Sequence, residues 1–179
     1  MAALIPSASA TGSGTMTLAG PSTNSNQTIT IPDATGTMMV SGNMPAFSAY
    51  QSSATSVSNA TGTKILFGNE SFDTNSNFAS SRFTPTVSGY YQISASVALN
   101  FSGASIVQLY MNTSTQVAFT YAAGITGALP STGVISKLLY FNGSTDYAEV
   151  FSYQNSGGSV NTDTNSAGTW FTGVLVRSA

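Results

Sequence analysis

The run Gly89-Tyr90-Tyr91-Gln92-Ile93-Ser94-Ala95-Ser96-Val97-Ala98-Leu99 is the longest clean alternation of side-chain types in the chain. Because side chains alternate across a β-strand, every second residue shares a face. The residues of the apolar face are Tyr91, Ile93, Ala95, Val97 and Leu99. This pattern predicts a strand with one face in a core. The other face is uncharged, whereas a face that meets only water usually carries some Lys or Glu, so we expect something besides water to cover it.

Composition points to a surface built from hydroxyls and amides. The chain has 179 residues, 41% of them hydrophobic and only 6% charged, with a net charge of −2. An ordinary soluble domain has about 25% charged residues. An uncharged polar surface can be buried against another subunit at little desolvation cost. The same composition offers no basic patch for nucleic acid and no apolar run long enough to span a membrane.

Enzyme chemistry has little support in the sequence. The chain lacks Cys and His, which removes disulfides, thiolate metal sites, nucleophilic triads of the usual kind and the commonest general base. Glu70 and Asp73 are neighbouring carboxylates, but they lie in a polar stretch where a turn role is favoured over a glycosidase pair. Asp146, Glu149 and Asp163 lack the spacing of a calcium loop. We therefore expect no enzyme, no metal site and no cofactor.

From Ala46 onward the pattern is strand, turn, strand. The expected strands are residues 46–50, 64–68, 89–99, 105–112, 116–121, 134–141, 147–154 and 169–177. Asn112-Thr113-Ser114 and Asn142-Gly143-Ser144 are strong turn signals. Residues 72–83 are expected as a long polar excursion anchored by aromatic residues. Since no helical period persists, the pattern predicts an all-β antiparallel sandwich of the jelly-roll type.

A hinge-like run, Gly42-Asn43-Met44-Pro45, divides the chain into an N-terminal segment, 1–43, and a head, 44–179. The segment contains three short apolar-alternating runs, at residues 15–18, 28–31 and 37–40. Each run is β-like but too short to bury a face by itself. Either three copies of the segment wind together into a short β-rich stalk, or the segment folds as a hairpin onto the head.

Several motifs in the head resemble the globular head of complement C1q and its tumour-necrosis-factor-like relatives. They are Pro45-Ala46-Phe47-Ser48-Ala49, the run Phe83-Thr84-Pro85 with Gly89-Tyr90-Tyr91-Gln92-Ile93, Asp146-Tyr147-Ala148-Glu149-Val150, and Phe171-Thr172-Gly173-Val174-Leu175. In this chain Ile93 replaces the family's usual Phe, and Ala148 stands at the position of its usual Val. The resemblance covers about residues 45–177. It implies a jelly roll that assembles as a tight trimer.

The run Thr28-Ile29-Thr30-Ile31-Pro32-Asp33-Ala34-Thr35-Gly36-Thr37-Met38 resembles the T-L-P-D-A-T-G-T-L element of phage fibre shafts and their attachment segments. That resemblance also implies threefold symmetry. The residues it assigns to particle attachment are Ile29, Ile31, Pro32, Asp33, Gly36 and Met38.

A threefold contact would cover the aromatic side chains that strands such as 147–154 and 169–177 carry on their second faces. The residues predicted at or near subunit contacts are Phe47, Tyr90, Gln92, Phe151, Tyr153 and Trp170. The alternative is that the core between two sheets absorbs most of them. Turn chemistry selects the loops expected to face a receptor, and their marker residues are Asn142, Asp146, Asn155 and Asp163.

The expected function is that of a homotrimeric, non-enzymatic phage virion protein on the particle surface, a capsid decoration (cement) protein or a short head fibre. Its partner on the virion would be the major capsid protein, or a tail or adaptor protein. A further expected partner is polysaccharide on the host surface, which many weak sugar contacts would bind by avidity. The main alternative is a receptor-binding tail fibre or tip protein. A secreted ligand of the complement-head type is a third class, which the absence of a secretory signal pattern in residues 1–6 disfavours.

Overall fold

The computed structural model describes residues 42, 44–124 and 130–179. These residues contain thirteen strands and no helix long and apolar enough to cross a membrane. The strands are β1 (Ala46–Tyr50), β2 (Ser56–Val57), β3 (Thr63–Lys64), β4 (Asn69–Asp73), β5 (Phe78–Ala79), β6 (Arg82–Phe83), β7 (Gly89–Leu99), β8 (Ala104–Met111), β9 (Thr115–Ala123), β10 (Ser131–Phe141), β11 (Ala148–Gln154), β12 (Val160–Asn161) and β13 (Trp170–Ser178). The predicted N-terminal attachment residues lie outside the described residues.

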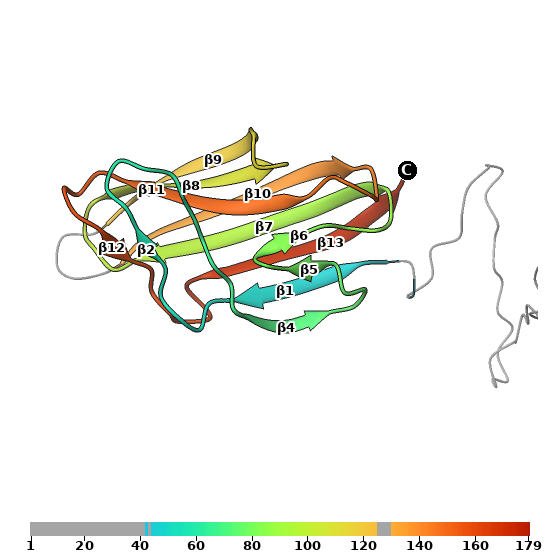
Figure 1. Ribbon diagram of the computed structural model, residues 1–179, viewed down its shortest axis with the longest axis horizontal. Helices are drawn as coiled ribbons and strands as arrows, with labels where there is room; N and C mark the ends of the chain where they lie inside the picture. Colours follow the sequence, from blue (N-terminus) through green and yellow to red (C-terminus); the bar gives the residue numbers. More distant parts are fainter. Residues whose placement is uncertain (1–41, 43, 125–129) are drawn as a thin grey trace, which may run out of the picture. The chain divides into compact units, whose positions relative to one another are not determined.

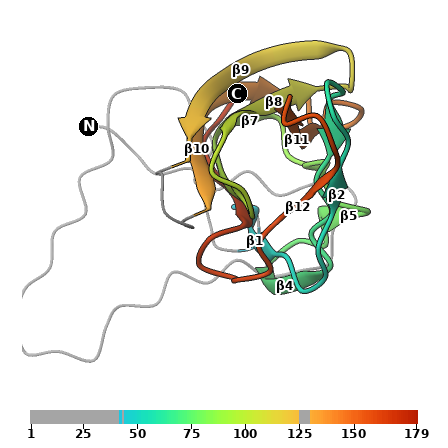
Figure 2. The same ribbon diagram turned by 90° about the vertical axis from the view of Figure 1, so that its left-hand side faces the viewer.

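Two antiparallel sheets face each other across the core (Figure 1). The first sheet has the order β10-β7-β13-β1-β4, and the second has the order β5-β6-β11-β8-β9, with β3 also paired to β11. An end-on view shows the strands of the two sheets arranged around the core (Figure 2). The predicted all-β antiparallel sandwich is confirmed.

β7 is an interior strand of the first sheet, with the edge strand β10 on one side and β13 on the other. Its predicted apolar face is fully buried, from Tyr91 to Leu99. An aromatic cluster packs beside it, in which the Phe47 ring stacks on Phe78 and Phe83 with centroid distances of 4.9 and 4.3 Å. Gly173 makes this possible, because a Cβ there would lie 2.5 Å from the Phe47 ring.

Two predicted segments differ from the structure. Residues 64–68 pair with β11 only at their start, where Lys64 faces Phe151 and Ile65 N–H donates to Val150 C=O at 2.9 Å; Ile65 and Phe67 are buried in the core. Asn69–Asp73, expected within or beside a polar excursion, is strand β4. Its polar residues are tolerated because β4 is an edge strand paired only with β1. The turn at Asn112 and Thr113 is confirmed by positive φ at both residues.

The strands give the head two distinct ends. At one end Leu175 N–H donates to Pro45 C=O at 2.9 Å, so the start of the head, just before β1, lies beside the C-terminal part of β13. β7 extends from this end through eleven residues, about 36 Å. At the other end, which we call the distal end, the β1–β2 connection meets the loop after β12, where the Thr162 hydroxyl donates to the Gln51 side-chain oxygen and accepts from Thr55 N–H.

Candidate functional site

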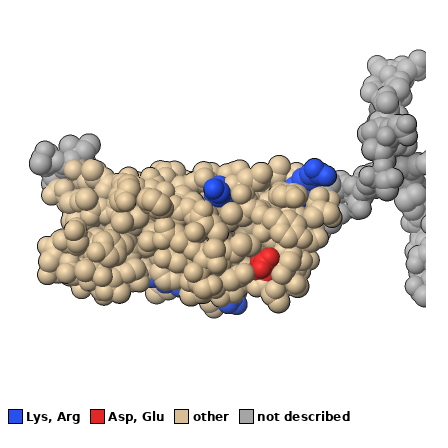
Figure 3. Space-filling model, turned by 90° about the horizontal axis from the view of Figure 1, so that it is seen from above, with Lys and Arg blue, Asp and Glu red and all other residues tan. Residues whose placement is uncertain are grey.

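The second face of β7 is part of a surface with few charges that extends across the first sheet, and we call this surface the open face. Its cross-strand rows follow from the pairing of β10, β7, β13 and β1. They are Tyr140–Tyr90–Arg177, Leu138–Gln92–Val174–Ala46, Ser136–Ser94–Thr172–Ser48 and Val134–Ser96–Trp170–Tyr50. Arg177, which pairs with Tyr90 beside the bulge in β13, is the one charged residue in these rows. Charged side chains are also sparse on the surface that Figure 3 displays.

Six of the residues on the open face form what we call the apolar patch: Tyr90, Val134, Leu138, Tyr140, Val174 and Val176. Each is between 41% and 58% exposed. The Tyr90 and Tyr140 rings contact each other, with centroids 5.5 Å apart. Large exposed apolar patches mark interaction sites in soluble proteins. The apolar patch is therefore the strongest candidate for a subunit contact.

At the distal end the chain itself covers part of the open face. The Ser96 hydroxyl donates to Gly168 C=O at 2.8 Å, and Thr169 Oγ1 accepts from Ala98 N–H at 3.2 Å. Ser96 and Ala98 are consequently buried. The question that the sequence raised about β7 thus has two answers: the loop before β13 covers one end of its second face, whereas Tyr90 and Gln92 remain accessible.

Two depressions lie on this face. One, which we call the apolar groove, has a volume of about 300 Å³ and runs between Phe72, Gln92 and Val174. The other, which we call the hydroxyl pocket, has a volume of about 560 Å³ and lies toward the distal end. It is lined by Ser48, Tyr50, Ser71, Ser166, Trp170 and Thr172.

The structure separates the residues predicted at subunit contacts. Tyr90 and Gln92 lie on the open face, and Trp170 lines the hydroxyl pocket. Phe151 and Tyr153 project from the outside of the second sheet, since they pair with Gln108 and Ile106 on β8 opposite the buried Val107 and Leu109 face.

Phe47 differs from the other predicted residues because its ring packs inside the protomer and is 1% exposed, so it offers a neighbour almost no surface of its own. Phe47 also lines the floor of the apolar groove, and its place at or near a subunit contact stays a prediction.

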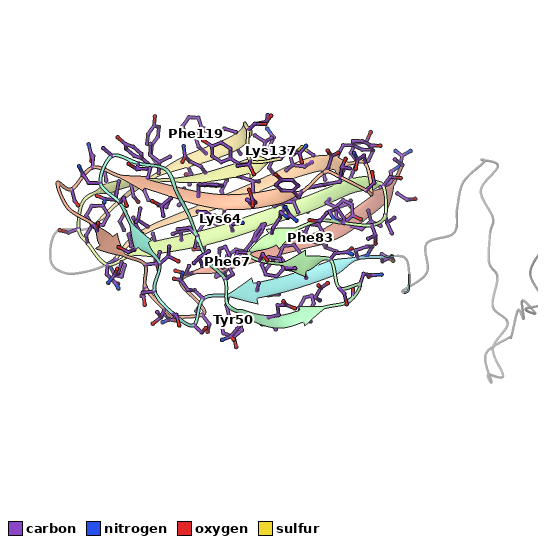
Figure 4. All side chains as sticks on the ribbon, viewed as in Figure 1. Tyr50, Lys64, Phe67, Phe83, Phe119 and Lys137 are labelled. Carbon is purple, nitrogen blue, oxygen red and sulfur yellow. The ribbon has the colours of Figure 1, made fainter. Side chains whose placement is uncertain are left out.

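Sequence reasoning missed Val134, Leu138 and Tyr140, although β10 carries apolar residues on both faces just as β7 does. It also missed the aromatic pair on β9. Phe119 and Tyr121 are 52% and 74% exposed, with ring centroids 5.4 Å apart. Phe119 lies at the upper side of the view in Figure 4, whereas Phe67 and Phe83 lie within the sandwich.

The predicted receptor-facing loops lie at opposite ends of the head. Asn142 and Asp146 follow β10 where Phe141 pairs with Gly89, at the end where the head begins. Asn155 and Asp163 lie at the distal end, where Asp163 N–H donates to Ala98 C=O. They do not form one surface. Within its own loop, Asn142 Oδ1 accepts the backbone N–H groups of Ser144, Thr145 and Asp146.

The charged groups have structural partners. In the described residues the one ion pair joins Lys64 Nζ to Glu149 Oε1 at 2.6 Å, and Thr113 Oγ1 donates to Glu149 Oε2 at 2.8 Å. Those residues contain no group of three or more His, Cys, Asp or Glu side chains placed to hold a metal ion. Burial raises the pKa of the Tyr91 hydroxyl to about 12, and this hydroxyl donates to Val87 C=O at 2.7 Å.

The sequence matches no protein-family model and no curated protein. Solved structures nevertheless share its fold. The globular domain of zebrafish complement 1qA protein is 14% identical, with a TM-score of 0.54 over 75% of this chain and 98% of that chain. Eiger TNF from S. frugiperda is 12% identical, with a TM-score of 0.57 over 76% and 93%, and murine APRIL is 9% identical, with a TM-score of 0.55 over 74% and 99%.

At these identities the likeness shows the fold. The head is a jelly-roll sandwich of the C1q and tumour-necrosis-factor type, as the resemblance of residues 45–177 predicted. The matched structures cover about three quarters of the chain and nearly all of each of their own chains. The resemblance of residues 28–38 to phage fibre shafts stays a prediction from the sequence.

Proposed function

We propose that this protein is a homotrimeric, non-enzymatic structural protein of a phage virion, located on the particle surface as a capsid decoration (cement) protein or a short head fibre. The observation that carries the proposal is the open face: one side of the first sheet has Arg177 as the one charged residue in its cross-strand rows and bears six half-exposed apolar side chains. Domains with this fold usually assemble as homotrimers. A trimer contact would bury the apolar patch away from water.

The shape of the head suggests how three copies fit together. In a closed ring with one contact type, each subunit uses two different surfaces, one against each neighbour. Here one surface is the open face with its apolar groove, between Phe72 and Val174. Phe119 and Tyr121 supply protruding aromatic rings on β9, the edge strand of the other sheet. We propose that this aromatic pair of one subunit fills the apolar groove of the next.

This arrangement keeps Tyr90 and Gln92 in the subunit contact. Phe119 and Phe151 share the outer face of the second sheet, in the row Phe119–Gln108–Phe151. We leave Phe151 outside the contact because it lies two strands away from Phe119 and its ring packs on Tyr110 with a centroid distance of 4.9 Å. Tyr153 lies on the same outer surface, two strands away from Tyr121. Since the open face carries few charges, assembly should depend only weakly on ionic strength.

Placement on a virion rests on the sequence of residues 28–38 and on where the N-terminal segment joins. The head begins at Pro45, at the end opposite the distal end. A trimer attached through three such segments fits a threefold or quasi-threefold site on a shell. There it would stabilise the shell by bridging neighbouring capsid subunits.

The second candidate function is a receptor-binding tail fibre or tip protein. The observation that favours it is the hydroxyl pocket, which lies toward the distal end of the head. The two candidates differ in position and in copy number, since a cement protein covers the shell and a tip protein occurs as a few trimers on the tail.

Quantitative mass spectrometry of purified phage particles, together with labelling of the chain in electron micrographs, tests both candidates. Many copies spread over the shell would support a decoration protein, and a few trimers at the tail would support the alternative. Light scattering of the purified full-length chain should report a trimer. A monomer that is absent from particles would overturn the proposal.

A further inference from the structure

The hydroxyl pocket joins three strands and a loop that are far apart in the sequence. Ser48 and Tyr50 come from β1, Ser71 from the bulge that β4 makes against β1, and Trp170 and Thr172 from β13. Ser166 lies in the loop before β13. Trp170 and Tyr50 are cross-strand partners, as are Thr172 and Ser48, so one row places two aromatic rings beside a row of two hydroxyls.

The polar groups of this pocket are half-buried or exposed, unlike the buried hydroxyls of the head. The buried hydroxyls have partners inside the protein: Ser105 bonds to Ser131 at 2.9 Å, and the Thr55 hydroxyl accepts from Gln51 at 2.7 Å. The side chains that line the pocket form no hydrogen bonds with one another or with other described residues. Four hydroxyls, a phenol and an indole N–H thus surround one depression without a partner among the described residues.

The chemistry of the lining selects the kind of ligand. No charged side chain lines the pocket, so a phosphate, a carboxylate or an amine would find no counter-charge there. A wholly apolar ligand would strip water from the hydroxyls without replacing its hydrogen bonds, which costs free energy for each group. A neutral sugar ring offers hydroxyls at its edge and C–H groups on its faces. It can bond the Ser and Thr hydroxyls while an apolar face rests on Trp170 or Tyr50.

We propose that the hydroxyl pocket binds a neutral saccharide. Its volume of about 560 Å³ lies within the usual range of small-molecule pockets, about 300–1,000 Å³. The site is open and its ligand uncharged, so a single pocket binds weakly, with a Kd of about 1 mM. Three pockets on a trimer and many trimers on a particle turn weak sites into stable adhesion. The inference rests on the proposed function for this adhesive role, but binding itself can be tested on the purified chain.

The chain contains a single tryptophan, so its fluorescence reports on Trp170 alone. The full-length protein is titrated with neutral oligosaccharides built from glucose, galactose and N-acetylglucosamine, and with the anionic trisaccharide sialyllactose as the charged comparison. We expect a saturable change in Trp170 emission with at least one neutral sugar, unchanged by added salt, and no change with sialyllactose. If no neutral sugar changes the emission at tens of millimolar, or if only sialyllactose does, the proposal is overturned.

Variants separate pocket binding from general effects. The double substitution Ser48→Val/Thr172→Val removes two facing hydroxyls on regular strands, where Val is favoured, and should weaken sugar binding by about tenfold or more. The control is Thr115→Val, which removes an exposed hydroxyl from β9 and should leave the affinity unchanged. Equal affinities of the wild-type chain and the double variant would overturn the proposal.

A neighbouring subunit could also occupy the pocket, and acrylamide quenching of the assembled trimer tests this. Trp170 should be quenched in the trimer and protected when the sugar is added. If Trp170 is already shielded from acrylamide before sugar is added, the pocket belongs to the subunit contact and the saccharide proposal is overturned. Light scattering on the same samples keeps the two proposals apart, because a trimer without sugar binding refutes only the pocket, and a sugar-binding monomer refutes only the assembly.

Discussion

Leu138→Glu is the sharpest perturbation of the proposed trimer, because Leu138 lies in the middle of the apolar patch. It is paired with Gln92 and lies between Val134 and Tyr140 along β10. Leu138 is 50% exposed in the protomer, so about half of its side chain is left for a neighbour to bury. Full burial of a leucine contributes about 1.5–3 kcal/mol, so the neighbour's share is about 1 kcal/mol.

A glutamate at this position also brings an unpaired carboxylate into the contact, which costs several kcal/mol, for example about 3 kcal/mol. The loss is then about 4 kcal/mol for each contact and about 12 kcal/mol for the three contacts of a trimer. At 1.4 kcal/mol for each factor of ten, the assembly constant falls by about eight to nine orders of magnitude. Because that constant depends on the square of the protomer concentration, the concentration for half-assembly rises by about four orders of magnitude.

Sedimentation velocity or light scattering across nanomolar to micromolar protein measures this shift, and circular dichroism confirms that the protomer remains folded. Leu66→Glu is the matched control, since Leu66 is 55% exposed on the segment after β3 and not on the open face. The control should remain trimeric. A Leu138→Glu protein that assembles like the wild type, or a Leu66→Glu protein that dissociates equally, would refute the assignment of the contact to the open face.

Four further outcomes follow from the structure. Phe151→Glu should leave the trimer intact by light scattering, because Phe151 lies two strands away from Phe119 on the outer face of the second sheet and packs on Tyr110; dissociation would extend the contact across that face to β11. Phe47→Ala should lower the free energy of unfolding of the protomer by about 3–5 kcal/mol in denaturant titrations, since it empties the centre of the aromatic cluster. Lys64→Ala should cost about 3–5 kcal/mol, because it leaves the Glu149 carboxylate buried without its cation, whereas Lys64→Met/Glu149→Gln should cost less; equal losses would contradict this reasoning. The pKa of Tyr91 is about 12 in the folded protein and about 10 in the unfolded chain, so the unfolded state loses this proton at lower pH than the folded state does. The free energy of unfolding therefore falls as pH rises from about 10 to 12, by about 3 kcal/mol at most. Tyr91→Phe should remove this part of the alkaline loss, as measured by unfolding titrations at pH 9 and 11.5.

The sequence alone was sufficient for much of the fold because strand periodicity is a local property. The alternation of residues 89–99 predicted both the strand and its buried face, and β1 begins and ends where its pattern predicted. The uncharged second face was also visible in the sequence. β4 was not, because a polar edge strand carries no apolar alternation and is held only by its pairing with β1.

Tertiary structure decided which aromatic residues are accessible. Phe47 and Tyr90 both lie on strands with apolar residues. Only the packing of the two sheets against each other buries Phe47 and leaves Tyr90 half-exposed. It also decided the ends of the head, since β10 separates the Asn142 loop from the distal loops along its whole length, and turn chemistry cannot tell one end from the other.

The second face of β7 shows the division most clearly. Its lack of charged residues predicted that something besides water covers it, but local sequence could not show what does so. The loop before β13 covers Ser96 and Ala98 through long-range hydrogen bonds, and the remainder of the face joins residues from β10 and β13 to form the apolar patch. The hydroxyl pocket likewise combines residues 48 and 172, which only sheet pairing brings together. Local sequence determines which faces a strand can bury, whereas its neighbours in the folded sheet determine what those faces meet.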